Sequence, residues 1–140
     1  MEQRDYLVKE IEKIGVILGT VLQPALRLLL GGDGNAAITL EHQMEDAKGK
    51  LLNEVNFDLD KFLDLSTEDS NEYILSFAGF SLENIGILAE CLSETGFSNQ
   101  CDNPKKYLEK ALQLYNLCNL KSKTYSLEKE TKINAIRNVL

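Results

Sequence analysis

The sequence predicts an all-α fold, and three observations support this prediction. Leu, Glu, Lys, Ala and Asn dominate the 140 residues, whereas Trp is absent and there are only two Pro, a composition that favours helices over strands. Apolar residues recur every three or four positions along most of the chain. No segment of useful length alternates apolar and polar residues as a strand does. We therefore expect a single-domain helical bundle over residues 1–140.

A long N-terminal helix is expected within residues 1–30, beginning near Asp5. Its apolar seam advances by 4, 3, 4 and 3 positions, which keeps the side chains on one helical face. Pro24 lacks the backbone N–H that a helix interior needs, so we expect a kink or a restart there, before residues 25–30. The glycines of residues 31–35 should end the helix. The seam consists of Leu7, Ile11, Ile14, Leu18 and Val21.

The middle of the chain, residues 36–80, should be helical and acidic. Helices are expected over residues 37–55 and 58–65, and a third should follow a cap at Ser66 or Thr67. Residues 54–72 hold seven Asp and Glu against Lys61 alone, and the sequence assigns this acidic segment no role. The side chains expected to point inward are Leu40, Met44, Ala47, Leu51, Val55, Leu59, Phe62, Leu63, Tyr73, Ile74 and Phe77.

Residues 81–140 predict a helical hairpin followed by a capping helix. Ser81, Asn103 and Ser126 are expected N-caps, and Pro104 suits a first helical position because its missing N–H has no partner there. The first helix should end at Gly96. The expected inward side chains are Leu82, Ile85, Leu88, Ala89, Leu92, Leu108, Ala111, Leu112, Tyr115, Cys118, Ile133, Ile136 and Leu140.

This hairpin resembles a tetratricopeptide (TPR) unit. "IGILAECLSETG" matches the first helix of the repeat and "YLEKALQLY" the second, with Gly96 at the turn and Ala111 as the small residue at the helix crossing. Pro104 stands where the repeat has Ala. The resemblance implies an antiparallel TPR-like hairpin whose groove could hold a peptide or a partner helix.

Both ends of the chain also resemble a group of small, uncharacterised bacterial proteins. The stretches that carry this resemblance are "RDYLVKEIEKIGVILG" and "KSKTYSLEKETKI", whereas the middle matches nothing familiar. The resemblance implies a bacterial cytosolic protein and brings no catalytic residues with it.

Cysteine usage and hydropathy bear on the compartment. Three Cys without repeated spacing, Cys91, Cys101 and Cys118, do not form a disulfide framework, so we expect reduced thiols in a cytoplasmic protein. The apolar run 14–30 contains Gln23, Pro24 and Arg27, which argues against a membrane span.

Charge is distributed unevenly. Residues 1–102 hold 7 Lys and Arg against 19 Asp and Glu, a net of −12, whereas residues 103–140 hold 8 against 3, a net of +5. The basic end could simply lie near the acidic middle, or it could face an anionic partner. Nucleic acid is not expected, because no binding motif is present and the rest of the chain would repel phosphate. The partner-binding candidates are Lys105, Lys106, Lys110, Tyr115, Lys121 and Lys123.

One cluster could carry chemistry. On a helix, Glu41 and Glu45 would share one face, and His42 and Asp46 the next. An imidazole beside carboxylates could bind a divalent metal, but a catalytic zinc needs three protein ligands, and a solvated helical face explains the pattern as well.

Two hypotheses follow. The first is a non-catalytic protein–protein interaction or scaffold module without a cofactor, which could self-associate as a homodimer through its first helix. The second is a small metal-dependent protein or enzyme that uses Glu41, His42, Glu45 and Asp46. The absence of a polar constellation suited to catalysis favours the first hypothesis.

Overall fold

The computed structural model describes residues 2–22, 36–98, 101–122 and 126–140, with the backbone alone for residues 2–5 and 36–39. Within these ranges every regular element is a helix, as predicted. The predicted kink at Pro24, the segment 25–30, the glycines of 31–35 and Lys123 lie outside the described residues. The described helices are α1 (Glu2–Leu22), α3 (Ala36–Val55), α4 (Leu59–Asp64), α5 (Thr67–Leu75), α6 (Leu82–Phe97), α7 (Pro104–Lys121) and α8 (Leu127–Val139).

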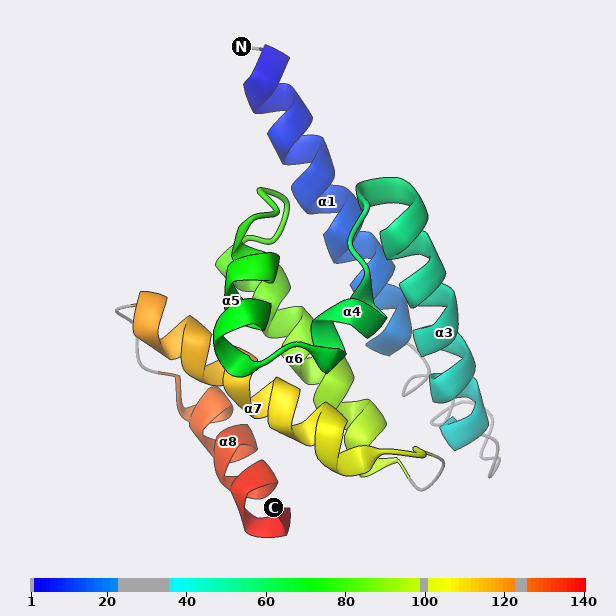
Figure 1. Ribbon diagram of the computed structural model, residues 1–140, viewed down its shortest axis with the longest axis vertical. Coiled ribbons are helices and arrows are strands. Elements are labelled where there is room, and N and C mark those ends of the chain that lie inside the picture. The colour runs from blue at the N-terminus through cyan, green and yellow to red at the C-terminus, as the bar shows by residue number, and fades with distance from the viewer. Residues whose placement is uncertain (1, 23–35, 99–100, 123–125) are drawn as a thin grey trace.

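The centre of the molecule is the pair α6 and α7, which pack as an antiparallel hairpin (Figure 1). Leu88, Ala89 and Leu92 of α6 and Ala111 and Leu114 of α7 are fully buried. Near the end of α6, a Cβ added at Gly96 would lie 2.7 Å from Leu108 of α7, so only glycine allows this approach. An antiparallel hairpin therefore forms at the predicted place, with Ala111 buried and Gly96 in close contact with Leu108, whereas its likeness to a TPR unit stays a prediction.

Helix α1 lies beside α3 and α6 (Figure 1). Ile14, Leu18 and Val21 of the predicted seam are buried, and they meet the apolar face of α3 that includes Met44 and Leu51. The earlier part of the seam differs from expectation: Leu7 is exposed, because the first turns of α1 extend beyond the other helices.

Two short helices, α4 and α5, cover one side of α7. Asp58 caps α4 and Ser66 caps α5, each by accepting a hydrogen bond from a backbone N–H three residues later. Phe57 is fully buried at the centre of an aromatic cluster that joins these helices to the rest of the core. The cluster consists of Phe57, Phe62, Tyr73, Phe77 and Phe80.

Helix α8 packs on α7 and buries Ile133 and Ile136. Its predicted cap is confirmed, because Ser126 accepts a hydrogen bond from the Lys129 N–H. Leu140 was expected inward and is instead 48% exposed, since it follows the last turn of α8.

Three further expectations about the hairpin are resolved. The Ser81 cap on α6 is confirmed, with the Asn84 N–H as its donor. Asn103 holds the N-cap position of α7 but makes no side-chain capping bond, so its predicted role was wrong, whereas Pro104 begins α7 as expected. Leu82 was expected inward and is largely exposed, because it sits in the first turn of α6 outside the packed face.

The membrane question has a direct answer for the described helices. Not one of them combines the length and the apolar character that crossing a bilayer requires.

Candidate functional site

Lys110, a predicted partner-binding residue, is buried inside the molecule and only 7% exposed. Its Nζ donates hydrogen bonds to the Leu65 carbonyl oxygen at 2.7 Å, the Ser70 hydroxyl at 2.9 Å and the Gln113 side-chain oxygen at 3.2 Å. Burial lowers the pKa of Lys110, but an ammonium with three acceptors remains the species that this geometry accommodates. Lys110 therefore fastens α7 to α4 and α5 and does not face a partner.

The contact between Ser70 and Lys110 has the composition of a nucleophile and its base. Ser70 is fully buried, however, and its hydroxyl already accepts from Lys110 and, at 2.6 Å, from the Gln113 amide. A base would need a free lone pair on Nζ, which a fully donating ammonium lacks. This cluster is structural.

Tyr115, another predicted partner-binding residue, is also buried. Its hydroxyl has no hydrogen-bond partner among the residues that the structure describes, and burial raises the pKa of Tyr115 above the usual value. The thiols of Cys91 and Cys118 lie buried as well, and burial raises the pKa of both. Neither thiol is placed to act as a thiolate nucleophile.

The remaining described members of that set lie on the surface of α7. Lys105 is exposed and stands 3.9 Å from Glu109, Lys106 forms an ion pair with Asp64 of α4, and Lys121 is exposed in the last turn. The basic end of the chain thus lies near the acidic middle, as the first reading of the charge pattern predicted. Of the described members of this predicted set, Lys105 and Lys121 are the exposed lysines.

The predicted metal cluster does not assemble. His42 is exposed, Asp46 pairs with Lys50 at 3.1 Å, and Glu45 pairs with Lys48 at 3.1 Å. Among the side chains that the structure describes, no three His, Cys, Asp or Glu lie together in a way that could hold a metal ion. The described residues therefore lack the ligand set that the metal hypothesis requires.

Glu41 and Glu45 do line a cavity of about 210 Å³ between α3 and the loop that joins α6 to α7. The Lys48 ammonium in its wall donates to the Tyr107 hydroxyl at 2.9 Å and also pairs with Asp60. Burial acts to lower the pKa of Lys48, but these hydrogen bonds outweigh it and raise the pKa well above the usual range. Lys48 is therefore a fixed cation that ties α3 to α4 and α7.

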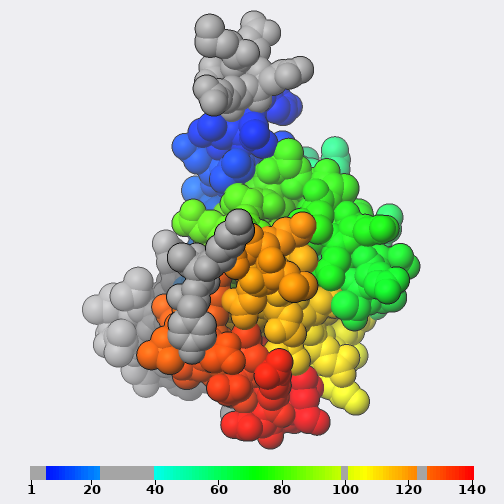
Figure 2. All heavy atoms as spheres, turned by 90° about the vertical axis from the view of Figure 1, so that its left-hand side faces the viewer, coloured from blue at the N-terminus to red at the C-terminus, as the bar shows by residue number. Residues whose placement is uncertain are grey.

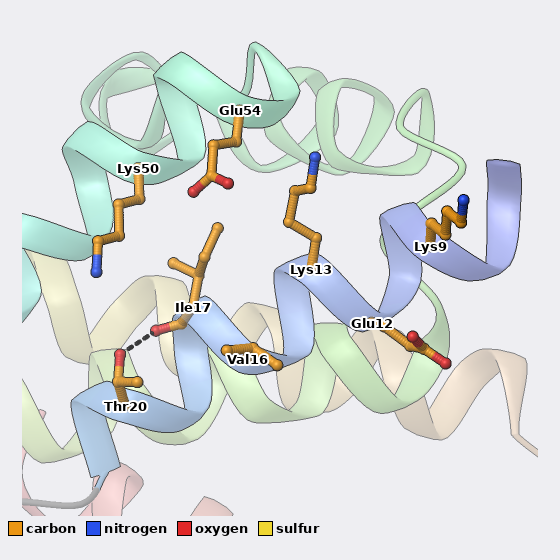
Figure 3. A pocket seen from close by; sticks show the side chains of 8 residues that line it. All are labelled: Lys9, Glu12, Lys13, Val16, Ile17, Thr20, Lys50 and Glu54. Carbon is orange, nitrogen blue, oxygen red and sulfur yellow. Dashed lines mark hydrogen bonds between the residues drawn. The ribbon is translucent and has the colours of Figure 1, made fainter.

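A larger groove, of about 520 Å³, runs between α1 and α3 (Figure 3). Lys9 and Lys13 rise from α1, whereas Lys50 and Glu54 descend from α3. Glu12 points away from α3, and the floor includes the apolar Ile17. Lys50 is engaged by Asp46, but no ion pair with a described residue engages Lys9 or Lys13.

The same helix exposes apolar side chains. Tyr6 is 75% exposed and Val16 is 67% exposed, and Leu7 and Val8 are also open to solvent. Figure 2 shows from a second direction that this part of α1 rises above the rest of the molecule. Apolar residues near unneutralised lysines make α1 the surface best suited to contact another molecule.

The sequence predicted self-association through the first helix, but it based this on the apolar seam, of which Ile14, Leu18 and Val21 are buried in the fold, and it did not identify the exposed stripe. The sequence did contain a signal for this stripe. The spacing of four and then three residues places Lys9, Lys13 and Val16 on one side of α1, away from the core. The predicted α7 residues, by contrast, are divided between the interior and the surface.

Comparison with known proteins adds no relative. Neither the protein-family models nor the curated proteins nor the solved structures contain a match to this chain.

Proposed function

We propose that this chain is a non-catalytic protein–protein interaction module that binds its partner through α1. The observation that carries the proposal is the exposure of Val16 opposite the buried face of Ile14 and Leu18, together with the exposure of Tyr6 and Val8 in the first turns of the same helix. Exposed apolar groups on an otherwise well-packed domain cost free energy in water, and association removes that cost.

Two surroundings of α1 support the proposal. The groove beside it offers room of about 520 Å³, and Lys9 and Lys13 give it positive charge that no ion pair with a described residue neutralises. Binding of an amphipathic helix in a groove uses such a combination of apolar anchors and charged flanks.

The proposal replaces the basic α7 surface as the principal binding site. Lys110 and Tyr115 are buried, and Lys106 is paired, so that surface offers few free contacts. A cytoplasmic location belongs to the same proposal, and the unpaired Cys91 and Cys118 support it, since buried thiols persist in a reducing compartment.

The test is affinity capture from a lysate of the source cells, with mass spectrometry of the bound proteins. The tagged wild-type chain is compared with a Tyr6→Ser, Val8→Ser, Val16→Ser variant. We expect at least one reproducible partner, reduced about tenfold or more by the triple substitution, which is the loss expected for about 1.4 kcal/mol of binding.

A matched control replaces two exposed apolar residues elsewhere, Leu120→Ser and Leu127→Ser. Point variants are needed because deleting residues 103–140 would remove α7 and expose the core. Equal capture by the α1 variant and the control, both folded by circular dichroism, would reject α1 as the binding surface.

A further inference from the structure

The exposed stripe on α1 has a counterpart on α5. Glu68, Glu72 and Leu75 of α5 are exposed and, like Lys9, Lys13 and Val16, are spaced by four and three residues. Residues at this spacing form one stripe along a helix, about 10 Å long at a rise of 1.5 Å per residue. The two stripes have opposite charges at two positions and an apolar side chain at the third.

The carboxylates of α5 are among the acidic groups that the fold leaves without an ion pair to a described residue. Within the acidic segment 54–72, Asp60 and Asp64 pair with Lys48 and Lys106, and Asp58 caps α4. For Glu68, Asp69 and Glu72, no ion pair with a described residue exists. Two lysines without an ion pair to a described residue thus lie on α1, and α5 carries three carboxylates without one, although Glu12, Glu54, Glu83 and Glu94 on other helices are carboxylates of the same kind.

These two helices cannot satisfy each other within one chain. In Figure 1, α5 covers α6 and α7 on one side of the molecule, whereas α1 and α3 lie on the other. Among the described helices, α1 and α5 do not form an extensive contact. A complementary partner for the α1 stripe must therefore come from another molecule.

We propose that α5 of a second copy of this chain docks in a parallel orientation beside α1, at the mouth of the groove between α1 and α3. In that register Lys9 meets Glu68, Lys13 meets Glu72, and Val16 meets Leu75. The proposal rests on the proposed function and specifies it, because it names the occupant of the α1 surface.

The groove accommodates the charges of the incoming helix. Lys50 is neutralised by Asp46, so the acidic groups that the docked α5 must avoid are Glu54 on α3 and Glu12, which lies three residues from Lys9 on α1 and points away from α3. Exposed ion pairs contribute little individually, and α5 has only 9 residues, so the contact is small. The association is therefore weak, and it weakens further as salt screens the charges.

The contact is heterologous, because it joins two different surfaces. Each copy still offers a groove at one place and an α5 at another after a first contact forms. We therefore expect the average mass to rise with concentration beyond that of a closed pair, unless the geometry closes a ring.

The test uses charge reversal, with mass measured by sedimentation velocity at low and at 0.5 M salt, a concentration at which the screening length is only a few ångström. The full-length Lys9→Glu, Lys13→Glu variant and the full-length Glu68→Lys, Glu72→Lys variant should each remain monomeric. Their equimolar mixture should associate again, because each reversed stripe then finds a complementary one. A variant with all four substitutions should also associate.

The matched control is Lys105→Glu, Lys121→Glu, which changes net charge equally on exposed residues of α7 and should associate like the wild type. A wild-type chain that is monomeric at every concentration would overturn the proposal, and so would a mixture that stays monomeric. In either case, α1-dependent capture of a different protein would still support the proposed function, so the two failures can be told apart.

Discussion

The hairpin of α6 and α7 and the helix α1 use apolar residues in different ways. In the hairpin, apolar side chains of both helices are enclosed, and a buried polar side chain such as Asn84 has specific partners, because its amide donates to the Ile11 and Gly79 carbonyl oxygens. In α1, one face is enclosed and the other carries Val16 in the open. The same residue types thus stabilise the fold in one region and present a surface in the other.

The largest effect should come from emptying the hairpin. Leu114→Ala should lower the free energy of unfolding by about 2–5 kcal/mol, because Leu114 is fully buried and the lost methyl groups leave a cavity. Val16→Ala should change it by less than about 0.5 kcal/mol. Urea denaturation of both variants measures the difference, and similar losses would remove the distinction between the two regions.

Overpacking the hairpin should have the next largest effect. Ala111→Trp should destabilise by about 1–3 kcal/mol, because Ala111 is fully buried where the two helices meet. The control is Ala135→Trp, at an exposed position of α8. Unchanged thermal stability of the Ala111 variant would show that the hairpin has room that its packing does not indicate.

Two tyrosines allow a finer comparison of buried hydroxyl groups. Tyr73→Phe should cost about 1 kcal/mol, because its hydroxyl accepts from the Asp58 N–H at 2.9 Å. Tyr115→Phe should be neutral or stabilising by up to about 1 kcal/mol, because its hydroxyl is buried without a partner. Urea denaturation curves of both variants measure these changes in the free energy of unfolding. If Tyr115→Phe destabilised the protein as much as Tyr73→Phe, the Tyr115 hydroxyl would have a hydrogen-bond partner.

The smallest effect concerns the ion pair that joins α8 to the hairpin. Lys132 donates to Glu90 at 2.8 Å, and a double-mutant cycle with Lys132→Gln and Glu90→Gln should give a coupling of about 0.2–1 kcal/mol at low salt. At 1 M salt the coupling should shrink toward zero. A coupling that is insensitive to salt would mean that the pair acts through packing.

The pH dependence of this pair has a defined sign. Burial acts to lower the pKa of Lys132, but Glu90 and Glu128 outweigh it, and the folded-state pKa lies above the ordinary 10.5. The contribution of the charged Lys132 to the free energy of unfolding is therefore complete below pH 10.5. It is lost as the pH rises through the folded-state pKa of Lys132.

Local features of the fold were predictable from the sequence. The caps at Ser66, Ser81 and Ser126 depend on a hydrogen bond to a residue three positions away, and the helical faces depend on periodicity. The prediction of a side-chain cap at Asn103 was wrong, because a capping residue needs a particular backbone conformation that the sequence does not reveal.

Side chains that bridge distant segments were not predictable. The sequence suggested that Lys110 is a surface charge. Its acceptors, the Leu65 carbonyl and the Ser70 hydroxyl, lie 45 and 40 residues earlier, and the periodicity of a helix does not reveal contacts over such a separation. Tyr115 was placed correctly on the apolar face of its helix, but that burial excludes it from a partner-binding surface. The candidate site therefore moved from α7 to α1.

The position of Lys110 also bears on the order in which α4, α5 and α7 can pack together as the chain is synthesised. The Leu65 carbonyl and the Lys110 ammonium are 45 residues apart, which at ribosomal rates separates their emergence by roughly 2–9 s. During that interval α4 and α5 lack the helix against which they pack. The acidic helix α5 therefore acquires its place, and its outward-facing carboxylates, only after α7 has left the ribosome.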